Sequence, residues 1–485
     1  MKKTKPEKST PKINATAILA VLVFSAFIAL FNETILNVAL NILMAEMNVT
    51  AGTIQWIVTA YMIVTAVMIP VTAFLIQSFE IKKLYLGAMT ILLIGTICAA
   101  FSNSFAMLLI SRMLQASGTG MMIPIMMNTI LLVTPREKRG TAMGICVCAI
   151  QLGPALGPTF SGIILQFLSW HALFFILVPL IILAMILGSV YLVNVSTLTK
   201  PKLDGLSILL STIGVGGIIF GLNGFSSGGN MKMTVMIFII GIIALIVFGK
   251  RQLSLKEPML EMRIFKYPLF SIGAALVMIS MMTVFTMNVM LPMFLQGALQ
   301  TTTFIAAIVL LPATLSNGFV TLIGGKIYDK LGAKVLIPVG FAIIFVGMVI
   351  ISRSTVNTSI ATIIVTYIAI CIGIGCTMSP AQTNALNQLP KEAYPHGVAI
   401  LNTLQQIAAA IGSSLFIGIM SASQLRALNN QVQEQAAVAS GFSTATLVMA
   451  GFVFIGLCLS FALRFENKKV TKDQSEVSFE DTSGL

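Results

Sequence analysis

Charged residues are scarce in this chain. Only 9% of its 485 residues are Asp, Glu, Lys or Arg, whereas 57% are hydrophobic and the mean hydropathy is +0.97. No single core of a soluble protein buries so large a share of apolar side chains. The composition therefore excludes a soluble globular protein and predicts an all-α protein that crosses a membrane many times.

Other absences narrow the class further. The sequence has no G-x-x-x-x-G-K-[ST] phosphate loop and no soluble nucleotide domain, which argues against an ATP-driven pump. Its six cysteines all lie in apolar runs, where they form neither a disulfide framework nor a metal motif. The first apolar run is too long for a signal peptide and lacks a cleavage site. We expect no enzymatic activity, no cofactor other than a coupling proton, no metal site and no cleavable signal peptide.

The distribution of basic residues predicts the orientation. A span needs about 20 apolar residues, and we count 14 candidate spans, the first at about 16–44. Segments on the side of the amino terminus hold 25 Lys and Arg residues, against three on the other side. By the positive-inside rule both termini are cytoplasmic. The net charge of +13 thus reflects the orientation of the chain in the membrane. Its expected partner is anionic membrane lipid rather than nucleic acid. We expect a monomer in a bacterial plasma membrane.

Two internal matches predict a duplicated architecture. The segment 325–334, Gly-Lys-Ile-Tyr-Asp-Lys-Leu-Gly-Ala-Lys, has a weaker copy 252 positions earlier, and Pro135-Arg136-Glu137 returns as Pro390-Lys391-Glu392. Parallel repeats of this kind place a substrate pathway between two halves. The predicted organisation is a tail (1–15), a six-helix bundle (16–195), two inserted transmembrane helices (206–249), a second six-helix bundle (269–464) and a charged, structureless tail (465–485).

Glu33 is the carboxylate that stands out. Every other acidic residue falls in a tail, in a loop or at the end of a span, and Arg112 is likewise the only basic residue deep inside an apolar run. A carboxylate at bilayer depth costs several kcal/mol, so it is rarely retained without a partner or a function. We expect Glu33 and Arg112 to carry proton coupling.

The segment 325–334 resembles the G-x-x-x-D-[RK]-x-G-x-[RK] signature of the major facilitator superfamily. Gly325, Asp329, Lys330 and Gly332 occupy its defining positions. In the first half Gln77 stands where the family has Asp, so a latch formed there is weakened or works differently. The resemblance implies the major facilitator fold; the alternative is a plain solvated run of charge.

The stretch from Arg112 to Gly120 resembles the R-x-x-Q-G-x-G-x-G element of the same superfamily. The resemblance implies that Arg112 touches the central cavity and couples to proton or substrate. The alternative is that its guanidinium merely pins helices together through carbonyls and amides.

Two further elements resemble drug:proton exchangers. One is a glycine-rich helix with a doubled Gly-Pro, which resembles the antiporter motif and comprises Gly153, Pro154, Gly157 and Pro158. The other is Asn32-Glu33-Thr34 with Asn37, which resembles the D-x-T-x-x-N-x-A-L-P element of the fourteen-span EmrB/QacA type. Asn32 occupies the position of the family's Asp. Glu33, the next residue, then either takes over the protonation role of that Asp or faces another helix and has a structural role. The doubled Gly-Pro element alternatively marks a kinked packing helix.

The resemblance covers roughly residues 16–465 and is nearest the LmrB-like branch of lincomycin and multidrug resistance transporters. It implies a proton-coupled exporter of hydrophobic or cationic drugs. The alternatives are a native-metabolite exporter or permease on the same fold and a non-transporting membrane sensor. Our candidates for the substrate cavity are the polar side chains of Asn32, Asn37, Tyr61, Gln115, Gln151, Asn288, Gln296 and Gln406.

Overall fold

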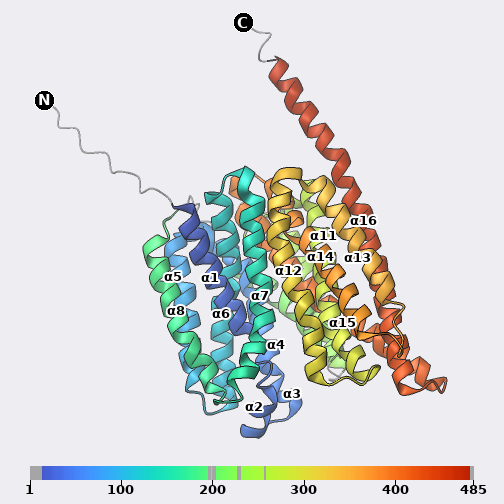
Figure 1. The fold of residues 1–485 in the computed structure, drawn as a ribbon. Helices are drawn as coiled ribbons and strands as arrows, with labels where there is room; N and C mark the ends of the chain where they lie inside the picture. The colour runs from blue at the N-terminus through green and yellow to red at the C-terminus, as the bar shows by residue number, and fades with distance from the viewer. Residues whose placement is uncertain (1–13, 195–197, 199–203, 227–230, 256–257, 481–485) are drawn as a thin grey trace, which may run out of the picture.

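The structure, a computed structural model, describes residues 14–194, 198, 204–226, 231–255 and 258–480. The described residues form helices and connecting turns, with no strand among them. Fourteen of the helices are long and apolar enough to cross a membrane, as the hydropathy predicts. Figure 1 shows twelve of them, the helices labelled α1, α4–α8 and α11–α16, packed side by side in two groups.

The first group is built from the amino-terminal helices. Its members are α1 (Ala15–Thr34), α4 (Trp56–Ser78), α5 (Ile81–Ala100), α6 (Phe105–Val133), α7 (Arg139–Ile164) and α8 (His171–Tyr191). The short α2 (Leu40–Glu46) and α3 (Ala51–Ile54) connect α1 to α4, and the 3-10 turn η1 (Arg136–Lys138) precedes α7. Within the group, α6 packs against α1, α4 and α5, and α1 packs against α7 and α8.

The second group repeats this arrangement. Its members are α11 (Pro268–Gly297), α12 (Thr303–Leu331), α13 (Ala333–Ile351), α14 (Ile360–Asn387), α15 (Tyr394–Asn429) and α16 (Glu434–Glu480). The 3-10 turns η2 (Met262–Lys266) and η3 (Lys391–Ala393) precede α11 and α15. Here α14 packs against α11, α12 and α13, as α6 does in the first group. The two groups are called the N bundle and the C bundle below.

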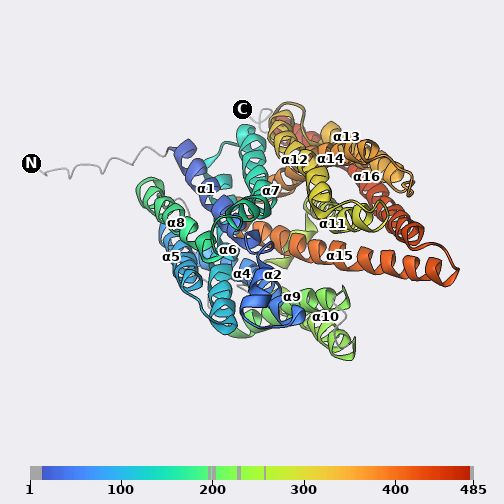
Figure 2. The same cartoon turned by 60° about the horizontal axis from the view of Figure 1, so that its bottom comes forward.

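Two further helices, α9 (Gly205–Ser226) and α10 (Met231–Ser254), form a hairpin outside both bundles. They pack on each other, and α9 also contacts α4 of the N bundle and α15 of the C bundle. Figure 2 shows this pair, called the insert below, beside the place where α4 and α15 meet. The fold is thus two six-helix bundles plus two extra helices, as predicted.

The bundles meet along two seams, α7 against α12 and α4 against α15. The face of the molecule with the start of α1, η1, η3 and the end of α12 is called the terminal face; α2 and α3 mark the opposite face (Figure 1). Near the terminal face one apolar cluster joins both bundles, for example Leu131 with Leu386 and Val398. The second large cluster lies within the C bundle alone.

Two predicted boundaries differ from the structure. The first span was expected to run to about residue 44, but α1 ends at Thr34 and a series of turns follows before α2. Hydropathy misses this end because Ile35, Leu36 and Ala39 are as apolar as the helix before them. At the other end, α16 continues to Glu480, where we expected a structureless tail from 465. Neither Gly nor Pro interrupts the sequence between Gly456 and Gly484, so nothing local stops the helix.

Candidate functional site

Arg112 occupies the centre of the N bundle and holds the carboxyl end of α1. Its side chain is fully buried on α6. One guanidinium nitrogen, Nη1, donates to the Asn32 carbonyl oxygen at 2.9 Å and to Gln115 Oε1 at 2.9 Å, and Nη2 donates to the Glu33 carbonyl oxygen at 2.7 Å. Carbonyls in the last turn of a helix lack partners further along it and carry the negative end of its dipole. The buried cation therefore caps α1.

Aromatic and hydroxyl groups complete this arrangement. The Arg112 guanidinium carbon lies 4.0 Å from the centre of the Tyr61 ring, a cation–π contact from α6 to α4. The Tyr61 hydroxyl lies 2.7 Å from Thr119 Oγ1, and Gln115 Nε2 donates to Thr96 Oγ1 at 3.3 Å. Four helices, α1, α4, α5 and α6, are thus joined through one buried cation. Thr96 and Thr119 were not predicted, because single threonines in apolar spans have no distinguishing pattern.

The Glu33 carboxylate is not part of this hydrogen-bonded set as far as the described residues show. Arg112 binds the main-chain oxygen of Glu33, while its charge also acts on the carboxyl group. The ion pairs among the described residues are Lys83–Glu80, Arg251–Asp204 and Arg263–Glu261. Glu33 is half-buried, and no hydrogen bond to its carboxylate oxygens is found in the described part of the chain. An acid placed near a cation but not tied to it can gain and lose a proton without breaking a network.

The structure brings together only some of the predicted cavity residues. Asn32, Tyr61 and Gln115 are buried around Arg112 in the N bundle. Gln151 on α7 reaches across the seam, with Nε2 3.4 Å from the Met378 sulfur on α14. Of the remaining candidates, Asn37 and Gln296 are exposed and Gln406 is half-buried. Asn288 is exposed and accepts a hydrogen bond from the Tyr367 hydroxyl at 3.0 Å. The structure therefore groups only the first set into one contact network.

The doubled Gly-Pro motif lies where α7 packs against α1. Its residues are Gly153, Pro154, Gly157 and Pro158. A Cβ on Gly153 would lie 2.9 Å from Leu30 Cβ, and one on Gly157 would overlap the Thr34 hydroxyl. That hydroxyl is 3.4 Å from the Pro154 carbonyl oxygen. The small residues thus let α7 approach α1 beside its capped end.

The C-half signature forms a contact between the bundles at the terminal face. Asp329, at the end of α12, accepts hydrogen bonds from the backbone N–H groups of Gly140 at 2.7 Å and Thr141 at 2.8 Å, and from the Thr141 hydroxyl. These amides belong to the first turn of α7, where a negative charge is favourable. Gly140 and Gly325 are in close backbone contact at this crossing. We call this contact the Asp329 latch.

The other two signature residues lie at the turn after the latch. Gly332 has a positive φ of 73°, which allows the sharp turn from α12 into α13. Lys330 is exposed beside it. The glycine is thus required by backbone conformation, whereas the lysine faces outward.

Arg139 is a cross-bundle residue that the sequence did not single out. It is buried at the start of α7, and Nη1 donates to Asn387 Oδ1 at 2.9 Å and to the Tyr394 hydroxyl at 2.8 Å, both in the C bundle. In the sequence it was one of many basic residues on the terminal side. The signal available was the repeat: Tyr394 stands 255 positions after Arg139, as Pro390 does after Pro135. Equivalent positions of the two halves therefore meet between the bundles.

Comparisons with known proteins agree with this architecture. Residues 22–413 match the family model for the Major Facilitator Superfamily. The lincomycin resistance protein LmrB of Bacillus subtilis (strain 168) is 45% identical over 420 residues, covering 86% of this chain and 88% of the relative. LmrB of Listeria monocytogenes is 40% identical over 93% of this chain and 98% of the relative. A solved structure, that of the human organic anion transporter MFSD10 (TETRAN), aligns with a TM-score of 0.65 and 11% identity, covering 93% of this chain and 100% of that chain. The last comparison bears on the fold alone.

Proposed function

This chain belongs to the Major Facilitator Superfamily, and from that premise we propose that it exports hydrophobic or cationic drugs across a bacterial plasma membrane in exchange for protons. That it is a multi-pass membrane transporter and not an enzyme follows from the family. Drug export is supported by two relatives that are lincomycin resistance proteins. Proton exchange is supported by the site around Arg112.

The placement of Glu33 is the observation that carries the proposal. Its carboxylate lies near the buried Arg112, outside the hydrogen bonds that this cation makes to main-chain oxygens. A protonated Glu33 is neutral and weakens the local attraction to Arg112, whereas the ionised form strengthens it. Loading and release of one proton therefore changes the electrostatics at the capped end of α1, where α7 packs closest.

The inward movement of one proton supplies enough free energy for drug export. One charge moving inward through 100 mV releases about 2.3 kcal/mol, which corresponds to a substantial gradient of a neutral or monocationic drug. In our scheme a proton reaches Glu33 from the outer side, the transporter turns inward, and drug binds as the proton leaves. The closed terminal face, with the Asp329 latch in place, fits the outward-facing end of this cycle.

Transport in reconstituted vesicles tests the proposal. We would measure efflux of ethidium, and separately of lincomycin, from proteoliposomes with an imposed pH gradient, comparing the native protein with Glu33→Gln. Glutamine keeps the shape of the side chain but cannot ionise, so gradient-driven efflux is expected to fall to the level of empty liposomes. Glu434→Gln, at an exposed carboxylate on the opposite face, is the matched control and should transport at the native rate.

The outcomes separate the two parts of the proposal. If Glu33→Gln still exchanges protons for drug, Glu33 is structural and the coupling site lies elsewhere. If the native protein moves neither drug while remaining folded, drug export itself is wrong, and a native metabolite becomes the substrate to seek.

A further inference from the structure

The two seams between the bundles are closed differently at the terminal face. At the α7–α12 seam the Asp329 latch joins the end of α12 to the first amides of α7. At the α4–α15 seam the residue equivalent to Asp329 is Gln77, an uncharged amide in place of the carboxylate. The start of α15, which corresponds to the start of α7 that donates to the latch, also differs: Pro395 stands where α7 has Gly140. Proline has no N–H to offer, so the same latch cannot form there.

A segment from outside the bundles occupies the start of α15 instead. The backbone N–H of Glu261 donates to Nδ1 of His396 at 3.3 Å, and His396 stands where α7 has Thr141. The neighbouring side chains of Met259 and Leu260 are each only 5% exposed and belong to the apolar cluster that joins both bundles. Residues 258–261, which precede η2, are therefore packed into the terminal end of this seam.

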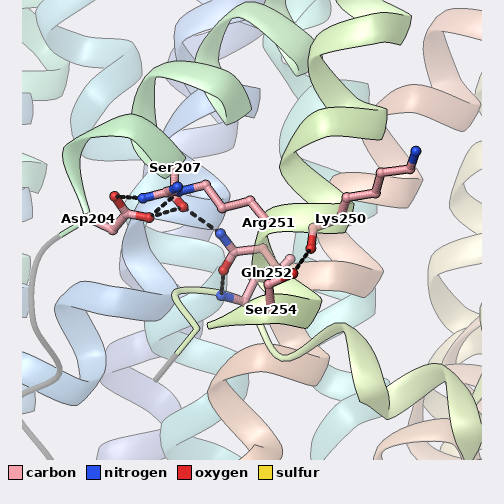
Figure 3. A network of polar contacts seen from close by, with 7 residues as sticks. Asp204, Ser207, Lys250, Arg251, Gln252 and Ser254 are labelled. Atoms are coloured by element: carbon pink, nitrogen blue, oxygen red, sulfur yellow. Dashed lines mark hydrogen bonds and ion pairs between the residues drawn. The ribbon is translucent and has the colours of Figure 1, made fainter. Parts of the chain in front are cut away.

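The segment 258–261 is fixed to the insert through a buried amide, that of Gln252 at the end of α10 (Figure 3). Gln252 Oε1 accepts the Leu260 N–H at 3.0 Å, and Nε2 donates to Ser207 Oγ on α9 at 2.6 Å. Both side chains, Gln252 and Ser207, are fully buried. A buried amide with its donor and its acceptor both engaged holds its neighbours in one arrangement.

An ion pair between Asp204 and Arg251 lies next to this amide and is linked to it through Ser207. Arg251 donates to both oxygens of Asp204, at 2.8 and 3.0 Å, and the Ser207 hydroxyl also donates to Asp204 (Figure 3). The hydrogen bond from Arg251, followed by that from Ser207, lowers the pKa of Asp204 to about 2. The carboxylate therefore stays ionised at physiological pH, and the paired, bidentate geometry ties α9 to α10.

Along its length the insert also touches both bundles at this same seam. Ala66 of α4 and Ala410 of α15 share a small apolar cluster with Val215 and Ile219 of α9. Nearer the opposite face the Trp56 ring of α4 lies 5.6 Å from the ring of Phe220 on α9. The insert thus follows the α4–α15 seam from one end to the other.

We propose that the insert is the clamp of the α4–α15 seam: it is anchored through Gln252 to the segment that contacts the start of α15, and it packs against α4. It thereby closes a seam that has neither the acid of the Asp329 latch nor, at Pro395, the first amide that the latch binds. The clamp is a property of the closed terminal face and does not depend on which substrate is carried. Opening this face then requires two separate releases, of the Asp329 latch at one seam and of the insert at the other.

Hydrogen–deuterium exchange of the full-length protein in lipid nanodiscs tests the clamp without a transport assay. Gln252→Ala should accelerate exchange about tenfold, the size expected from losing buried hydrogen bonds, in peptides from the start of α15 and the end of α4. Peptides from the start of α7 and the end of α12 should keep native rates. Asp329→Asn should give the reverse pattern.

Ser254→Ala is the matched control, because Ser254 lies on the same helix, is exposed, and among the described residues donates only to the Lys250 carbonyl of its own helix. It should exchange like the native protein. Ser207→Ala, which keeps the Asp204–Arg251 pair, should reproduce the Gln252→Ala pattern at smaller size and replaces that variant if it fails to fold. Faster exchange confined to α9, α10 and residues 258–261, with unchanged exchange in α4 and α15, would overturn the proposal.

Discussion

At the scale of single residues, the important fact is that Arg112 binds carbonyl oxygens and not a carboxylate. A buried guanidinium needs several acceptors in a planar arrangement to offset the loss of water. The ends of its fork find them in Asn32, Glu33 and Gln115, while the Tyr61 ring covers its face. The alternative role, in which Arg112 pins helices together, is thus present in the structure, and the same contacts bring its charge beside Glu33.

Arg112→Lys tests what the fork contributes. A single ammonium cannot reach the Asn32 and Glu33 carbonyls and Gln115 with the same geometry, so we expect the capped end of α1 to loosen while the charge remains. Gradient-driven efflux should fall about tenfold, which corresponds to about 1.4 kcal/mol for one lost charge-assisted hydrogen bond. Size-exclusion elution and thermal unfolding should show that the variant is folded. Native efflux from Arg112→Lys would mean that charge alone, without the fork, is sufficient.

At the scale of elements, glycines set the distance between helices at the latch. A Cβ on Gly140 would collide with the Asp329 carboxylate and would lie 2.6 Å from the Gly325 carbonyl oxygen. A Cβ on Gly144, one turn later, would lie 2.9 Å from the Thr321 carbonyl oxygen. Backbone atoms cannot move aside as a side chain does, so α7 and α12 approach this closely only because both carry glycine.

Gly140→Ala should therefore separate α7 from α12 at the terminal face. We expect a destabilisation of about 1–3 kcal/mol, the usual range for inserting a methyl group into a packed contact. It should be visible as a lower midpoint of thermal unfolding in detergent. Gly162→Ala on the same helix is the control, because a Cβ there meets nothing within 4 Å. Equal midpoints for the two variants would show that the crossing tolerates a wider spacing.

At the scale of the whole molecule, the duplication is approximate, and the differences are informative. Both halves place six helices alike, yet one seam has an acid latch and the other has the insert. Rocking of two bundles requires seams that open and close at a small energetic difference. Because different contacts close the two seams, the energy of opening one seam can change without changing that of the other.

The orientation of the molecule is a prediction that the fold does not test. The count of 25 basic residues against three predicts that the terminal face lies in the cytoplasm. Green fluorescent protein fused to the carboxyl terminus should therefore fluoresce, and alkaline phosphatase fused there should be inactive. Alkaline phosphatase inserted after Arg353, between α13 and α14, should be active. The reverse pattern would invert the direction of transport that we propose.

The sequence by itself determined the class of this protein and much of its architecture. Apolar runs long enough to cross a bilayer identify the spans, because a membrane leaves few alternatives for a polar backbone. Asp329 and Gly332 were found at sequence level because a tight turn and a helix-end contact need those residue types at fixed spacing. Glu33 and Arg112 stand out in the sequence because charge is costly in an apolar span, and their role in proton coupling stays a prediction.

Only the tertiary structure decided how these residues are used. The end of α1 at Thr34, the binding of Arg112 to carbonyls and the meeting of Arg139 with Tyr394 all depend on contacts between residues 79 or more positions apart. The same is true of the insert, which hydropathy shows as two more spans, while its place along the α4–α15 seam follows from packing. The local sequence pattern predicts which segments form spans and turns. The partner of a buried polar group depends on which distant residues the fold brings next to it.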